Sequence, residues 1–229
     1  MTRIEGIPRR RAGLFTKFAY RSTQRQVGRM VDPVAVYAHA PTLLAGYGAF
    51  EQATGRQHRV PERLKVLAET RAAAVVNCEF CVDIASHIAR EAGITEAQLL
   101  AMPRYRESDE FDGLEKLVLD YATAISRSPT EVTDELFAAL RKHFDERQLV
   151  ELTNVIALEN MRARFNSAFD MTPAGFSDGM VCVPMEKPTN AAAPGAQPTA
   201  EAAEVNSADA DSADAAGSVT PTTKVQTAV

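Results

Sequence analysis

Apolar residues recur at intervals of three and four along most of this chain, which is the pattern of amphipathic helices. The first helix is expected over residues 11–30, where Leu14 and Phe18 recur at helical spacing. No strand pattern competes with the helical one, and the single plausible extended piece is 180–184. We therefore predict an all-α fold, with seven or eight helices in one domain over residues 11–185.

Start and stop signals divide the helical pattern into elements. Asp32 can cap a helix whose first residue is Pro33, and Pro41 should kink or divide that helix before its end near residue 54. Asp145 with Gln148 forms the capping box of a last long helix that ends near residue 169. The remaining helices are expected over 62–76, about 78–92, a short stretch after the capping box of Thr95 and Gln98, 109–127 and 133–144.

The two ends of the chain differ from the helical region in composition. Residues 1–10 contain Gly6 and Pro8 and are expected to be disordered. Residues 186–229 contain no Leu, Ile, Phe, Tyr, Trp or Met, and such a segment cannot bury enough apolar area to offset the entropy lost on ordering. This Ala-, Pro-, Thr- and Asp-rich segment also carries most of the excess negative charge, so a disordered acidic tail is predicted.

Charge and hydropathy restrict the location and partners of the protein. The net charge of −5 argues against nucleic acid as a partner, since phosphate binding requires a basic face. No run of about 18 apolar residues is long enough to span a membrane. The Arg-rich N-terminus lacks the apolar stretch of a secretory signal, and three cysteines do not make a disulfide scaffold. We expect a cytoplasmic protein.

The residues best suited to chemistry are Cys78 and Cys81. Two cysteines at i and i+3 lie on one face of a helix, about 60° apart. The same spacing suits the first helical turn, where unpaired N–H groups and the macrodipole stabilise a thiolate. A thiolate can attack a peroxide oxygen, become a sulfenic acid and be resolved by its neighbour to a disulfide. The pair therefore predicts a redox dithiol.

Two other interpretations of the pair remain open. The cysteines can be small core residues that form a structural pair. Cys182 is expected to be a packing residue as well, and not a third redox thiol. A zinc site would need about four ligands, and no second Cys or His pair stands at a suitable spacing. Neither a metal nor a cofactor is expected.

Acid–base partners for the thiols are harder to find. When residues 78–92 are phased as one helix, His87 lies about 180° from Cys78 and points away from both thiols. The other histidines, His39, His58 and His143, are assigned no chemistry. Glu69 lies in a mostly apolar run nine residues before Cys78 and is either a base for a thiol or a solvated partner of Lys65.

The run 69–99, ETRAAAVVNCEFCVDIASHIAREAGITEAQL, resembles the carboxymuconolactone decarboxylase-like family of the AhpD-like superfamily, and residues 115–169 and 175–182 resemble it as well. The resemblance implies an all-α, AhpD-like domain that assembles as trimers or hexamers. It also implies thiol-dependent peroxidase activity, with Cys78 and Cys81 as the two motif cysteines and the second cysteine as the usual attacker.

The family's proton relay differs in this chain. Ala85 replaces the histidine expected four residues after the second cysteine, and Val66 replaces the glutamate commonly found twelve residues before the first. Glu69 matches an alternative placement of that glutamate in some relatives. The decarboxylase branch proper typically lacks the Cys-x-x-Cys pair.

The sequence thus favours a thiol-dependent peroxidase or thiol–disulfide oxidoreductase with Cys78, Cys81 and Glu69 as its catalytic residues. Its expected partners are a peroxide or disulfide substrate, an unknown thiol reductant and further copies of the same chain. The alternatives are a non-catalytic helical oligomer with a structural cysteine pair, which would act in ligand binding or interaction, and a carboxymuconolactone decarboxylase-type enzyme.

Overall fold

The computed structural model describes residues 2–186, and this part of the chain confirms the predicted all-α fold. The helices are α1 (Leu14–Val27), α2 (Asp32–Tyr37), α3 (Pro41–Gly55), α4 (Glu62–Val76), α5 (Glu79–Glu91), α6 (Glu96–Ala101), α7 (Gly113–Ser126), α8 (Asp134–Leu140) and α9 (Glu146–Ala168), with a 3-10 turn at Met102–Arg104. These nine helices within residues 2–186 exceed the expected seven or eight, because Pro41 divides one predicted helix into α2 and α3. The segment 180–184 forms no strand.

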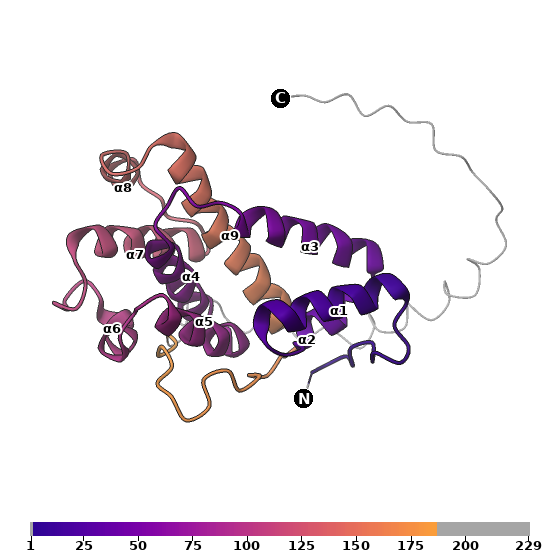
Figure 1. The fold of residues 1–229 in the computed structure, drawn as a ribbon. Coiled ribbons are helices and arrows are strands. Elements are labelled where there is room, and N and C mark those ends of the chain that lie inside the picture. The colour runs from indigo at the N-terminus through magenta and orange to yellow at the C-terminus, as the bar shows by residue number, and fades with distance from the viewer. Residues whose placement is uncertain (1, 187–229) are drawn as a thin grey trace, which may run out of the picture. The chain divides into compact units, whose positions relative to one another are not determined.

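The middle of the helical domain is α4, which packs against α5, α7 and α9 (Figure 1). Ten of its fifteen residues are buried, so it has almost no solvent face. Its alanines at positions 68 and 72–74 have no exposed surface, and their small side chains let three neighbouring helices approach closely. The helices α1 and α2 pack on α3, which in turn contacts α9.

Capping explains most helix starts. The predicted capping boxes at Thr95 and Asp145 are both formed, with reciprocal side-chain and backbone hydrogen bonds. A further capping box at Asp112 begins α7 at Gly113, later than the predicted residue 109. The predicted cap at Asp32 is wrong by one residue, because Val31 occupies the N-cap position without a side-chain hydrogen bond.

The segment after α9 has no regular structure, but it is tied to α5. The carboxylate of Asp83 accepts hydrogen bonds from the backbone N–H groups of Ala174, Phe176 and Ser177 at 2.7–3.0 Å. Asp83 is 5% exposed, so these are buried, charge-assisted bonds that hold the segment firmly. They place residues 174–183 along the outer side of the cysteine-bearing helix.

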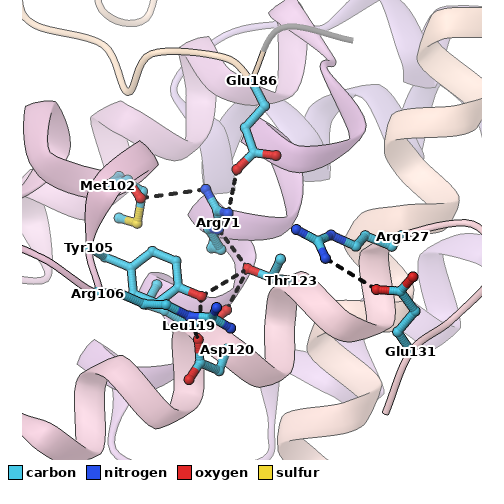
Figure 2. A network of polar contacts seen from close by, with 10 residues as sticks. All are labelled: Arg71, Met102, Tyr105, Arg106, Leu119, Asp120, Thr123, Arg127, Glu131 and Glu186. Atoms are coloured by element: carbon cyan, nitrogen blue, oxygen red, sulfur yellow. Dashed lines mark hydrogen bonds and ion pairs between the residues drawn. The ribbon is translucent and has the colours of Figure 1, made fainter. Parts of the chain in front are cut away.

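The folded region reaches at least Glu186, the first residue of the predicted tail. Its backbone N–H bonds to Ala74 at 3.2 Å, and its carboxylate pairs with Arg71 of α4. Figure 2 shows the surrounding network, in which buried Arg71 also donates to Thr123 at 2.8 Å and lies over the ring of Tyr105. The rest of the predicted tail, 187–229, lies outside the described residues.

The N-terminal segment 2–10, expected to be disordered, contains no helix but is hydrogen-bonded to the domain. The backbone N–H of Arg3 bonds to the carbonyl of Phe169 at 2.8 Å, and that of Ile7 bonds to Ala35 at 2.9 Å. The hydroxyl of Tyr20 donates to the carbonyl of Ile7 at 2.6 Å. These bonds connect the segment to α1, α2 and the end of α9.

Candidate functional site

Cys78 and Cys81 lie at the start of α5, where the chain turns sharply after α4. Asn77 makes this turn with a left-handed backbone, at φ 61° and ψ 45°, and Cys78 follows as the N-cap residue. The Cys78 Sγ accepts the backbone N–H of Cys81 at 3.2 Å. Both side chains are free thiols, and both residues are 3% exposed.

The surroundings separate the acidities of the two thiols. Hydrogen bonds from the Cys81 thiol and backbone N–H lower the pKa of Cys78, although burial opposes this effect. The pKa of Cys81 is raised, because its thiol donates a hydrogen bond to the sulfur of Cys78. Burial and the nearby Glu159 raise it further, since both disfavour a negative charge on Cys81. The pair therefore favours one thiolate at Cys78, with the remaining proton shared between the sulfurs.

Cys81 faces a cavity of about 530 Å³, and Cys78 is not among its lining residues. This size is typical of small-molecule sites. The walls are mainly apolar and come from α1, α2, α3, α4, α5 and α9, with Phe18, Val66, Phe80 and Phe165 among them. A ligand in the cavity would therefore meet Cys81 first.

Four charged side chains line the cavity, and they form one cluster. Arg162 of α9 donates from Nε and Nη2 to Glu51 at 2.8 and 2.5 Å. Its Nη1 lies 3.1 Å from Glu159 and 3.3 Å from Glu69. The predicted alternative for Glu69, a pair with Lys65, is not formed, because Lys65 instead pairs with Glu62 and Glu151. Glu69 thus lies in the cavity, as a catalytic role requires.

Burial makes two of these carboxyl groups, Glu69 and Glu159, weaker acids, whereas hydrogen bonds and the charge of Arg162 lower the pKa of Glu51 against the effect of burial. Burial raises the pKa of Glu69 to about 7, against the lowering effect of Arg162 and with the help of the negative charges of Glu159 and Glu51. The pKa of Glu159 is also raised by burial, although Arg162 partly offsets this effect. The cluster can therefore hold and release a proton close to neutral pH.

Sequence reasoning missed two polar residues of α9 beside the second thiol. Glu159 lies close enough for its negative charge to raise the pKa of Cys81, and the Asn166 amide nitrogen donates to the Cys81 Sγ at 3.4 Å. Both residues are buried, and both are far from the cysteines along the chain. The spacing of Glu159, Arg162 and Asn166, at i, i+3 and i+7, would have given a signal, because it places three polar groups on one face of a helix with an apolar core side.

The positions of the two replaced relay residues both face the cavity. Ala85 and Val66 line it together with Cys81. His87 does not, and its side chain is 39% exposed, with its Nε2 3.8 Å from Glu91. The histidine nearest in sequence to the thiols therefore points away from them, as the helical phasing predicts.

Within residues 2–186, no group of three or more His, Cys, Asp and Glu side chains is arranged to hold a metal ion. In the same range, every helix is too short or too polar to cross a membrane.

Comparison with known sequences identifies the family to which this helical domain with its Cys-x-x-Cys turn belongs. The model of the carboxymuconolactone decarboxylase family matches residues 41–124. The uncharacterized protein YnjA of Escherichia coli is 35% identical over 153 residues, which cover 66% of this chain and 84% of YnjA. The uncharacterized protein YdfG of Bacillus subtilis is 29% identical over 140 residues, or 61% and 95% of the two chains. The chain belongs to the carboxymuconolactone decarboxylase family.

Solved structures place the chain in the AhpD-like superfamily. The debrominase Bmp8 matches with a TM-score of 0.68 at 21% identity, covering 76% of this chain and 92% of Bmp8. An alkylhydroperoxidase AhpD core protein from Ralstonia eutropha matches with a TM-score of 0.67 at 19% identity, covering 76% and 94%. A putative antioxidant defence protein AhpD from Agrobacterium tumefaciens has a TM-score of 0.53 at 27% identity, covering 60% and 95%. The predicted family and fold are both confirmed.

Proposed function

We propose that the protein is a thiol-dependent peroxidase or thiol–disulfide oxidoreductase that uses Cys78 and Cys81 as its redox pair. The observation that carries this proposal is the asymmetry of the pair. Cys81 faces a ligand-sized cavity, whereas Cys78 lies behind it as the N-cap of α5, bonded to the Cys81 backbone. This asymmetry supports Cys81 as the sulfur that meets a substrate and Cys78 as the sulfur that resolves the product.

The proposed reaction begins with transfer of the shared proton to Cys78, which leaves Cys81 as the attacking thiolate. Cys81 attacks the terminal oxygen of a hydroperoxide, the O–O bond breaks, and the leaving alkoxide takes a proton from Glu69. Cys78 then attacks the sulfenic sulfur of Cys81, and the displaced hydroxide takes the Cys78 proton and leaves as water. Two electrons pass from the thiols to the peroxide, and an external thiol must return them to the disulfide.

A disulfide substrate would enter the same sequence. Cys81 attacks one sulfur, the first thiol leaves, and Cys78 displaces the second product group by forming the internal disulfide.

The alternative function is that of a non-catalytic protein with a structural cysteine pair. A structural pair would also be buried, as both cysteines are, and experiment distinguishes the two functions.

Single cysteine variants test the proposal. Cys81→Ser should abolish hydroperoxide consumption supported by dithiothreitol, and Cys78→Ser should prevent the internal disulfide that mass spectrometry detects after mild oxidation. Cys182→Ser is the matched control and should retain both properties, because Cys182 does not line the cavity. Full redox activity in Cys81→Ser would overturn the proposal and favour a structural pair.

A further inference from the structure

The charge of the cavity is unbalanced. Among the described residues that line it, the charged ones are Glu51, Glu69, Glu159 and Arg162, and the thiol pair adds a further negative charge when it ionises. Each of the three guanidinium nitrogens of Arg162 already contacts a carboxylate. An anionic ligand would therefore find no free cation among these residues, whereas a cationic ligand would meet three carboxyl groups that share a single guanidinium.

Two buried polar atoms beside the cavity have no hydrogen-bond partner within residues 2–186. The Oε1 of Glu159 and the Oγ1 of Thr70 are both without one, and both residues line the cavity. The Glu159 side chain is 8% exposed, and Thr70 has no exposed surface. Buried oxygens of this kind are normally paired, so their positions indicate a missing donor.

Aromatic rings also line the cavity. Tyr37 stacks on Phe165, with ring centroids 4.0 Å apart, and Tyr47 stacks on Tyr37 at 4.7 Å. Phe15 and Phe18 of α1 add two further rings that are partly exposed to solvent. Aromatic faces bury apolar groups and also attract cations.

We propose that the cavity binds an organic cation, an amine or amidinium group on an apolar body. The charged head lies against Glu159 and Glu69 and donates to the free Glu159 oxygen, while the body lies among the aromatic rings of α1, α2 and α3. The statement that such cations are the substrates of the thiol site rests on the proposed function. Binding of the cation itself does not require thiol chemistry. The same charge distribution opposes a carboxylate substrate of the decarboxylase type.

Binding is tested in the Cys81→Ser variant, in which thiol chemistry at the cavity is removed. Calorimetry would compare benzylamine, benzyl alcohol and benzoate, which share one ring and differ in charge. We expect benzylamine to bind about tenfold or more tightly than the alcohol, because a carboxylate at contact distance favours a cation by at least that factor. Equal binding of amine and alcohol, or tighter binding of benzoate, would overturn the inference.

Charge variants locate the site of binding. Glu159→Gln and Glu69→Gln keep the shape of each side chain, and each should remove most of the preference for the amine. Glu107→Gln is the matched control on an exposed turn and should leave the preference unchanged. A preference for the amine that survives both cavity variants would place the cation elsewhere and contradict the proposal.

A second measurement separates this inference from the proposed function. The reduced natural protein is oxidised with one of three disulfides: the cationic cystamine, the neutral bis(2-hydroxyethyl) disulfide or the anionic dithiodipropionate. The rate of each oxidation is divided by the rate at which the same disulfide oxidises dithiothreitol. Cystamine should be favoured about tenfold, since Cys81 meets a substrate held by the carboxylates. Equal normalised rates overturn the inference and leave the redox function standing. Benzylamine binding without oxidation by any disulfide or hydroperoxide would instead overturn the redox function and keep the cation site.

Discussion

At the scale of single residues, the site depends on a cysteine in a position that usually holds Ser, Thr, Asp or Asn. Cys78 caps α5 through its sulfur. The sulfur that takes part in the proposed redox reaction therefore also accepts a hydrogen bond from a backbone N–H at the helix start. A thiolate accepts that bond better than a thiol does, which links ionisation of the pair to the helix terminus. Cys78→Ser preserves the cap and is therefore a suitable variant for separating chemistry from folding.

The missing relay histidine gives the first prediction. Ala85 lies one helical turn beyond Cys81 and lines the cavity, so Ala85→His would place an imidazole beside the attacking thiol. We expect peroxidase turnover to rise by about tenfold or more, compared with about 10²–10⁴-fold for an optimally positioned general base. Steady-state hydroperoxide reduction measures the effect.

His87→Ala provides the control for this variant. The His87 side chain is exposed, close to Glu91, and outside the cavity, so its removal should change turnover by less than about twofold. Loss of activity in His87→Ala with an intact fold would show that His87 is the relay residue and that Ala85 is not the equivalent position.

The pKa of Glu69 gives a pH dependence of stability. Glu159 and Arg162 of α9 and Glu51 of α3 face this group, and burial raises its pKa from 4.5 to about 7. The folded state holds the Glu69 proton more tightly than the unfolded chain does. Its stabilising contribution is therefore complete below pH 4.5 and is lost as the pH rises to about 7.

Glu69→Gln should remove this dependence. Between pH 4.5 and 7.5, the free energy of unfolding of the natural protein should fall by about 1–3 kcal/mol relative to that of the variant. Urea denaturation at several pH values measures the difference, and Glu107→Gln should follow the natural protein. Parallel pH profiles for the natural protein and Glu69→Gln would show that the Glu69 pKa is close to its ordinary value.

At the scale of helices, three elements bring the site together for different local reasons. The left-handed turn at Asn77 directs α5 back along α4, so the first turn of α5 faces the middle of the domain. The capping box at Asp145 fixes the start of α9 and therefore the helical phase of its polar residues. Asp83 then holds the segment after α9 against the outer side of α5, which leaves the inner side to the cavity.

At the scale of the whole molecule, three of the most exposed apolar side chains lie on α1 and α3. Leu14 and Phe18 of α1 are 87% and 67% exposed, and Leu43 of α3 is 63% exposed. Exposed apolar side chains that occur together on neighbouring helices favour association with another surface. We propose that the protein is a homo-oligomer, for which the family resemblance implies a trimer or a hexamer.

Light scattering coupled to size exclusion tests the assembly. At micromolar concentration, the natural protein should have a mass well above the 24.8 kDa of one chain. Phe18→Asp should shift the mass towards that of one chain, because it places a charge in an apolar contact, whereas Lys17→Asp should not. A natural protein of monomer mass at this concentration would contradict the proposal.

The sequence by itself determined the all-helical fold, most helix boundaries and the cysteine pair, because these depend on signals that are local in the chain. Proline, capping boxes and the three-residue spacing of Cys78 and Cys81 act within one or two turns. Tertiary structure alone decided that Cys81 faces the cavity, that Glu69 pairs with Arg162 and that Glu159 approaches the thiol. These contacts join α3, α4, α5 and α9, and they depend on how the helices pack, which no local pattern specifies. Burial among them then sets the acidity of each group, since the protein interior replaces water around it.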